Sequence, residues 1–218
     1  VCALLLHVLA HKGVLHLDER VSSFWNAFRG HGKEGVTVRN VLEHRSGFAS
    51  YVPAGATVRT LLDYDAMTAG LEEALPTERA GTAAYHALSY GWVVGAVDQR
   101  AVSRKTGAVP SFGGLLLEHV ISPLGLQGQV FAGLPEEGSE EARRWCVYDR
   151  LASCTINRPA GEAADIFDEV ASSSGDGLAL DPRVFNDPSV RRANIPAANM
   201  HFTAHSLATI YASLAGCT

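Results

Sequence analysis

Lysine is scarce in this sequence: Lys12, Lys33 and Lys105 are the only lysines among 218 residues. The formal net charge is −5, so the chain lacks the basic surface that binding to nucleic acid requires. We therefore expect no nucleic-acid partner. The composition, with 47% hydrophobic and 19% charged residues, is typical of a globular domain that buries a sizeable core.

The four cysteines lack the spacing of a metal site or a redox motif. No two of them form C-x-x-C, and no cysteine–histidine set has zinc-finger spacing. His7 and His11 lack the acidic neighbour of H-E-x-x-H, so we interpret them as the polar edge of a helix. We expect no metal and no organic cofactor. Unpaired thiols favour a reducing, intracellular compartment.

The sequence also lacks a membrane span. Its first residues, VCALLLHVLAHKG, are apolar but short, and they contain two histidines and a lysine. They have neither the basic start nor the cleavage site of a signal peptide. We interpret them as a buried amphipathic helix that begins upstream of Val1. Because the other end, LAGCT, stops as abruptly, we expect the chain to be a fragment.

Helices dominate the expected structure, with capping residues and glycines at their ends. A strand is expected in GQVFAGL, and a loop-rich insertion is expected around 134–182 of a single partial domain, 1–218. The expected helices are 1–12 before Gly13, a helix from Thr37 towards Gly47, one or two helices in 57–75, a helix from Ser89 to about Thr106, one after Ser111, and one after Thr203.

Five segments resemble, in the same order, signatures of the serine β-lactamase-like family. They are HVLAHKGVLHLDERVSSFW, VTVRNVLEHRSGF, YHALSYGWVVGAVDQRAVSRKTG, LLLEHVISPLGL and NIPAANMHFTAHSLATIYASLA. The second is similar to I-T-V-R-x-L-L-x-H-T-S-G-L, and the third to Y-S-N-x-G-Y-x-L-L-G-x-I-I-E-x-x-T-G. This family includes class C β-lactamases, esterases and penicillin-binding proteins.

The resemblance implies the helical lobe of the α+β β-lactamase/transpeptidase-like fold. In that fold the lobe packs against an antiparallel sheet, whose strands come from both ends of the domain and are mostly missing here. We therefore expect a mainly α structure. YH and FNDPSVRRANIPAAN look closest to eukaryotic members, including those fused to aarF-type kinases. A kinase-like domain is accordingly a candidate partner in the full-length chain.

The family's chemistry is acyl transfer through a covalent serine ester. In its S-x-x-K motif, serine and lysine share one face of a helix, so that lysine can accept the serine proton. Leu9, Gly30 and Val102 stand three residues before the lysines of this chain, so the motif is absent. We expect the nucleophile to lie just before Val1. A pseudoenzyme that has lost it is the alternative.

Two segments imitate catalytic motifs. Lys105, Thr106 and Gly107 spell K-T-G, but they end an expected helix, whereas the family's third motif lies on a strand near the C-terminus. We expect the true K-T-G or H-x-G motif beyond Thr218. Ser46 could act as a nucleophile with a base two residues before it, but no G-x-S-x-G turn surrounds it. The resemblance instead makes HRSG the H-T-S-G block, with arginine replacing threonine.

Tyr85 matches the tyrosine of the family's Y-x-N motif, which takes part in the proton transfers of the acyl-transfer reaction. The motif here reads Tyr85-His86-Ala87, so a methyl group replaces an asparagine that would contact substrate. This favours ester or peptide-like acyl substrates over β-lactams. Tyr85 is our predicted catalytic residue, and a core tyrosine is the alternative. His86 is a weaker candidate for substrate binding, with packing outside the site as its alternative.

Gly91 and Gly95 lie four residues apart in the helix that follows, where a glycine is destabilising by about 1 kcal/mol relative to alanine. We expect them to allow close packing in the central helix of the lobe.

The predicted function is a serine hydrolase that acts on a small ester or amide substrate. The alternative is a non-catalytic binding or assembly module. In either case we expect residues 1–218 alone to be inactive.

Overall fold

The computed structural model describes residues 1–53, 56–77, 81–136, 185 and 187–216. The expected insertion around 134–182 therefore lies outside the described residues from 137 onward. In chain order the elements are α1 (Cys2–His11), η1 (Val21–Ser23), η2 (Asn26–Arg29), α2 (Val38–Leu42), α3 (Val58–Leu62), α4 (Tyr64–Glu73), α5 (Ser89–Thr106), α6 (Phe112–Leu116), the π-helical turn η3 (Leu117–Ile121), β1 (Val130–Ala132), α9 (Pro188–Arg192), β2 (Met200–Phe202) and α10 (Ala204–Leu214).

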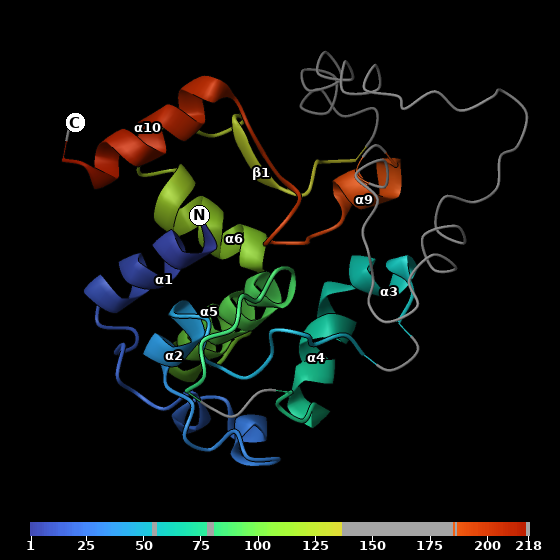
Figure 1. The fold of residues 1–218 in the computed structure, drawn as a ribbon. Coiled ribbons are helices and arrows are strands. Elements are labelled where there is room, and N and C mark those ends of the chain that lie inside the picture. Colours follow the sequence, from blue (N-terminus) through green and yellow to red (C-terminus); the bar gives the residue numbers. More distant parts are fainter. Residues whose placement is uncertain (54–55, 78–80, 137–184, 186, 217–218) are drawn as a thin grey trace, which may run out of the picture.

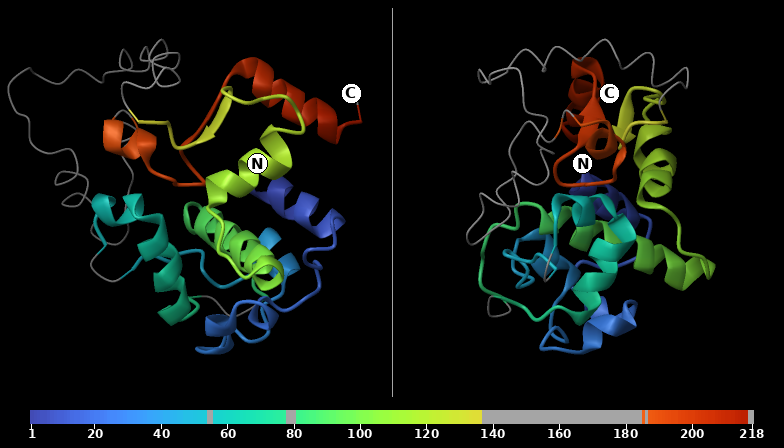
Figure 2. Two further views of the ribbon diagram at one scale, coloured as in Figure 1. Left: turned by 180° about the vertical axis from the view of Figure 1, so that it is seen from behind. Right: turned by 90° about the vertical axis from the view of Figure 1, so that its right-hand side faces the viewer.

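Helix α5 is the centre of the fold, as Figures 1 and 2 show, and it packs against α1, α2, α4 and α6. Its valines Val93, Val94 and Val97 are fully buried. A Cβ atom at Gly91 would meet the backbone nitrogen of Ala197, so the expected close approach of another backbone is confirmed there. At Gly95 the prediction is wrong, because the nearest atoms belong to the side chains of Tyr64 and Phe112. The prediction of a central helix is thus correct, and it explains why glycine stands inside it.

Side-chain caps begin three of the expected helices. Thr37 accepts a hydrogen bond from the amide of Asn40, and Ser111 accepts one from Gly114. Thr203 caps α10 in the same way. The prediction for Ser89 is wrong, because α5 has no side-chain cap and Ser89 is already its first helical residue.

The sheet among the described residues consists of two short antiparallel strands (Figure 1). β1 confirms the strand expected in GQVFAGL, and Val130 lies opposite Phe202 of β2. β2 was not expected, because MHF sits between a turn at 196–198 and a capped helix without an alternating pattern of its own. The structure is therefore mainly helical, as the sequence predicts.

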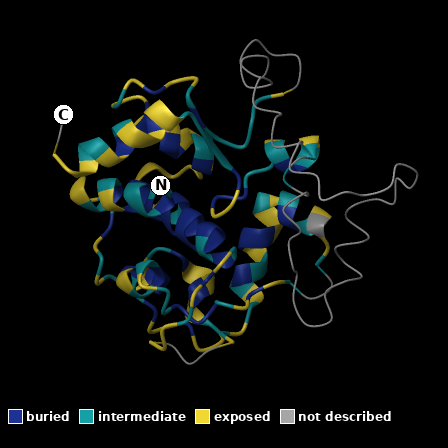
Figure 3. Cartoon of the chain, turned by 45° about the horizontal axis from the view of Figure 1, so that its top comes forward, coloured by how far each residue is buried: buried dark blue, intermediate teal, exposed yellow. Residues whose placement is uncertain are grey.

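The N-terminal helix buries one face in the core, whereas α10 buries little of its surface. Leu5, Leu6 and Leu9 of α1 are fully buried, while on the expected apolar face of α10 only Ile210 is buried. Figure 3 shows the exposed residues along this outer helix near the C-terminus. Within the described part of the chain, no helix combines the length and apolar character needed to cross a membrane.

Candidate active site

The segment that carries Tyr85 lies against the turn that follows α2. The amide of Ala84 donates to the carbonyl oxygen of His44 at 3.0 Å. The hydroxyl of Ser89 donates to the carbonyl oxygen of Phe48 at 2.6 Å, which explains why it does not cap α5. Tyr85 is thus held in a short connection that is hydrogen-bonded to the same turn on both sides.

His44 forms the corner of that turn. It adopts a left-handed backbone conformation with φ of 57°, which is uncommon for a residue other than glycine. Its ring stacks on Tyr90 with centroids 4.4 Å apart, and the ring of Tyr85 lies 5.1 Å away on the same histidine. Burial, together with neighbouring His86, lowers the pKa of His44. The imidazole of His44 beside the ring of Tyr85 is therefore neutral at neutral pH.

His86 points into the interior, where 1% of its surface is exposed. Its Nδ1 lies 2.5 Å from the carbonyl oxygen of Ala84, and because a carbonyl only accepts, Nδ1 carries the proton. Nε2 of the neutral ring then accepts from the amide of Phe48 at 3.1 Å and from the hydroxyl of Ser46 at 2.8 Å. The structure thus places the second predicted site residue behind Tyr85 rather than on an open surface.

Ser46 has a histidine partner, but it is His86 and not His44. Both members of the pair are buried, and no surface of Ser46 is exposed. A nucleophile must reach its substrate, which is not possible for a serine enclosed in this way. The pair is therefore a structural hydrogen bond, in agreement with the interpretation of HRSG as a non-nucleophilic block.

Tyr85 itself is 77% exposed, so within the described part of this chain it lies outside the core. Ala87 is also exposed beside it. A large aromatic residue on a fixed backbone and open to solvent has no role in packing the core.

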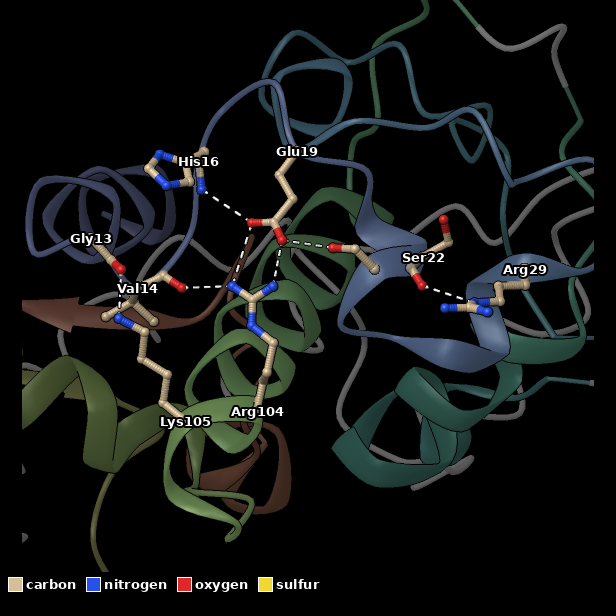
Figure 4. A network of polar contacts seen from close by, with 9 residues as sticks. Gly13, Val14, His16, Glu19, Ser22, Arg29, Arg104 and Lys105 are labelled. Atoms are coloured by element: carbon tan, nitrogen blue, oxygen red, sulfur yellow. Dashed lines mark hydrogen bonds and ion pairs between the residues drawn. The ribbon is translucent and has the colours of Figure 1, made fainter.

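The K-T-G imitation is structural. The ammonium group of Lys105 donates to the carbonyl oxygen of Gly13 at 2.5 Å (Figure 4). Next to it, Arg104 pairs with Glu19 and donates to Val14 at 2.9 Å. Gly107 ends α5 with φ of 76°, as expected for a helix terminator. This network ties the C-terminal end of α5 to the loop after α1.

The other two lysines also have structural partners. Lys33 is fully buried, and its ammonium group donates to the carbonyl oxygens of Leu71 (2.9 Å) and Glu72 at the end of α4. Lys12 contacts Nδ1 of His119 at 3.0 Å. Each lysine is thus engaged by a carbonyl group or an imidazole. The structure brings Tyr85, His86, His44 and Ser46 together and places all three lysines elsewhere.

The chain matches known proteins along almost its full length. The Beta-lactamase family model matches residues 1–216. The esterase/beta-lactamase LipL of Mycobacterium tuberculosis is 30% identical over 224 residues, which cover 98% of this chain and 48% of LipL. The crystal structure of a family VIII carboxylesterase matches with a TM-score of 0.74 and 28% identity, and covers 98% of this chain and 52% of that protein.

A penicillin-binding protein homologue from Caulobacter crescentus matches similarly, with a TM-score of 0.70, 28% identity and coverage of 98% of this chain and 52% of that protein. The chain thus spans about half the length of the relatives that it matches. The two solved structures share the fold of this chain. The chain belongs to the Beta-lactamase family.

Proposed function

We propose that this chain is part of a serine hydrolase that cleaves an ester or amide through an acyl-serine, with Tyr85 in the proton relay. The observation that carries the proposal is the exposed tyrosine, 77% accessible, on a backbone fixed by hydrogen bonds on both sides. An open hydroxyl in a fixed position can pass a proton between the attacking serine and the leaving group. Water then cleaves the acyl-serine and regenerates the enzyme.

The nucleophile in this proposal lies outside residues 1–218. No serine of this sequence stands three residues before a lysine, and the lysines of the chain have structural partners. An S-x-x-K pair elsewhere in the full-length protein would supply serine and general base together. A kinase-like domain in the full-length protein is also part of the proposal, from the resemblance to eukaryotic relatives.

An ester is the substrate that the surroundings of Tyr85 favour. Ala87 replaces the asparagine of Y-x-N, and an exposed methyl group cannot hydrogen-bond the amide of a β-lactam side chain. The names of the matching esterase/beta-lactamase and carboxylesterase support ester cleavage as the reaction.

A serine-directed phosphonate probe tests this proposal on the full-length protein. We expect one labelled serine, located by peptide mass spectrometry outside residues 1–218 and followed three residues later by lysine. A label on Ser46 would contradict the proposed location of the nucleophile. Absence of any label on folded protein would favour the alternative below.

The alternative is a non-catalytic domain used for binding or assembly. Ala87 favours it, because the loss of a polar group at a substrate-binding position is expected where catalysis has been lost. Met200 also favours it, because the family usually has glycine at this position. In the structure Met200 is paired in the sheet opposite Ala132. Under this alternative, the full-length protein shows neither probe labelling nor turnover of nitrophenyl esters.

A further inference from the structure

Two histidines join the Tyr85 segment to the turn after α2. The ring of each histidine accepts a hydrogen bond from a backbone amide of the other segment. Nδ1 of His44 accepts the amide of His86 at 3.1 Å. Nε2 of His86 accepts the amide of Phe48, also at 3.1 Å. We propose that this pair, here called the histidine clasp (His44 and His86), positions Tyr85 for proton transfer; the inference rests on the proposed function of Tyr85.

The clasp acts on the backbone on both sides of Tyr85. The amide of Ala84, before it, is bonded to the carbonyl oxygen of His44, and the amide of His86, after it, is bonded to the ring of His44. The ring of His44 also lies 5.1 Å from that of Tyr85. With its backbone fixed, Tyr85 keeps only side-chain rotations, so its hydroxyl can sweep only a small region.

The second half of the clasp fixes the turn itself. His86 is buried and uses both ring nitrogens: Nδ1 donates to Ala84, and Nε2 accepts from Phe48 and Ser46. A buried amide such as that of Phe48 needs a partner, and this imidazole provides it. The family pattern Y-S-N has serine in place of His86, and a serine has no pair of ring nitrogens to bridge two segments. The His86 half of the clasp is therefore a departure of this chain from that pattern.

Removal and conservative replacement of His86 in the full-length protein separate positioning from general stability. In His86→Ala we expect kcat for a nitrophenyl ester to fall about 100-fold with little change in KM, since misplacing a catalytic group by about 1 Å has an effect of this size. His86→Gln keeps an acceptor and a donor, and we expect it to restore most of kcat. Equal losses in both variants, or no loss in either, would overturn the proposal.

His119→Ala is the matched control. His119 is a half-buried histidine, less enclosed than His86, and its side-chain partner is Lys12 at the end of α1. Lys105 joins that end of α1 to the C-terminal end of α5. Tyr85 precedes the opposite, N-terminal end of α5, and this helix is roughly 27 Å long. We expect unchanged kcat in this control. A loss equal to that of His86→Ala would assign the effect to stability and contradict the clasp.

Hydrogen exchange decides the clasp even if the protein has no hydrolase activity. In His86→Ala we expect the Phe48 amide to exchange about fivefold to tenfold faster, the factor that one ordinary hydrogen bond provides. Absence of turnover in the unaltered protein, together with faster exchange in the variant, would refute the proposed function and keep the clasp. Unchanged exchange would refute the clasp whatever the turnover.

A spectrum of the unaltered full-length protein covers the case in which His86→Ala does not fold. With ¹⁵N-labelled histidine, the clasp requires the proton on Nδ1 of His86 and on Nε2 of His44, because the other nitrogen of each ring accepts an amide. The reverse tautomer at either histidine, or a doubly protonated ring at neutral pH, would overturn the proposal.

Discussion

Asp98 shows how a single residue can affect the stability of the whole lobe. Its carboxyl group lies in the central helix α5, fully buried, and neither oxygen has a hydrogen-bond partner in the described part of the chain. Burial raises the pKa of Asp98 well above its usual range, because a charge is poorly solvated there. The group is therefore a neutral acid over part of the pH range in which exposed aspartates are charged.

Asp98 predicts a pH dependence of stability with a defined sign. Its pKa is higher in the folded than in the unfolded protein, so its contribution to stability is fully present below the unfolded pKa near 3.8 and is lost as pH rises towards the folded pKa. Asp98→Asn removes this contribution. In urea unfolding at pH 5 and pH 8, we expect the wild type to lose more stability than the variant, by up to about 1.4 kcal/mol per pH unit. Parallel losses in both proteins would refute this account.

A motif in the sequence is enough to select Tyr85 as a candidate, whereas the residues that surround it could not be predicted. The motif does not say that His86 points inward, since a histidine next to a motif residue can face either way. The bond between His86 and Ser46 joins residues forty positions apart, and no local pattern encodes it. The contacts of His44 with the Tyr85 segment were missed for the same reason, although the H-x-S-G pattern at the end of a capped helix is a usable signal.

At the scale of elements, local rules predicted most helices. Thr37, Ser111 and Thr203 have short side chains that compete well for free amides at a helix start, and each caps the helix expected of it. The cap predicted at Ser89 was wrong, because the hydroxyl group of Ser89 donates a hydrogen bond to the carbonyl oxygen of Phe48, which is distant in sequence. The rules thus fail where a partner distant in sequence competes with the local one.

Two glycines test the packing of α5 against its neighbours. A Cβ atom at Gly91 would collide with the backbone of Ala197, which cannot move like a flexible side chain. We expect Gly91→Ala to destabilise the fold by about 1–3 kcal/mol, measured by thermal or urea unfolding. Gly113 in α6 has open space around it, so Gly113→Ala should be neutral or stabilise by up to about 1 kcal/mol. Equal effects of the two changes would contradict the packing described.

On the scale of the whole molecule, the order of the five family segments predicted the mainly helical architecture. The sequence did not predict the groove between α1 and α10, a cavity of about 320 Å³ lined mostly by apolar side chains that include Leu4, Tyr211 and Leu214. The helical pattern identifies the apolar face of α10, but it does not say what covers that face. An amphipathic pattern shows which face of a helix is apolar, but that face is buried only where another surface covers it.

The isolated chain provides a test at this scale. Residues 1–218 contain Tyr85 but no S-x-x-K sequence, so we expect them to hydrolyse neither nitrocefin nor a nitrophenyl ester above background. The full-length protein, assayed in parallel, should turn over the ester. Robust turnover by the isolated chain would place a complete catalytic site within it and contradict the account.

The central claim, that Tyr85 carries protons in ester cleavage, is tested most directly by kcat/KM of Tyr85→Phe in the full-length protein. Phenylalanine keeps the ring and removes the hydroxyl group. We predict a fall of about 10²- to 10⁴-fold, the usual contribution of a general acid or base. Tyr211→Phe, at a tyrosine of α10 that is 65% exposed, should leave kcat/KM unchanged. Turnover by Tyr85→Phe at the wild-type rate would contradict the account.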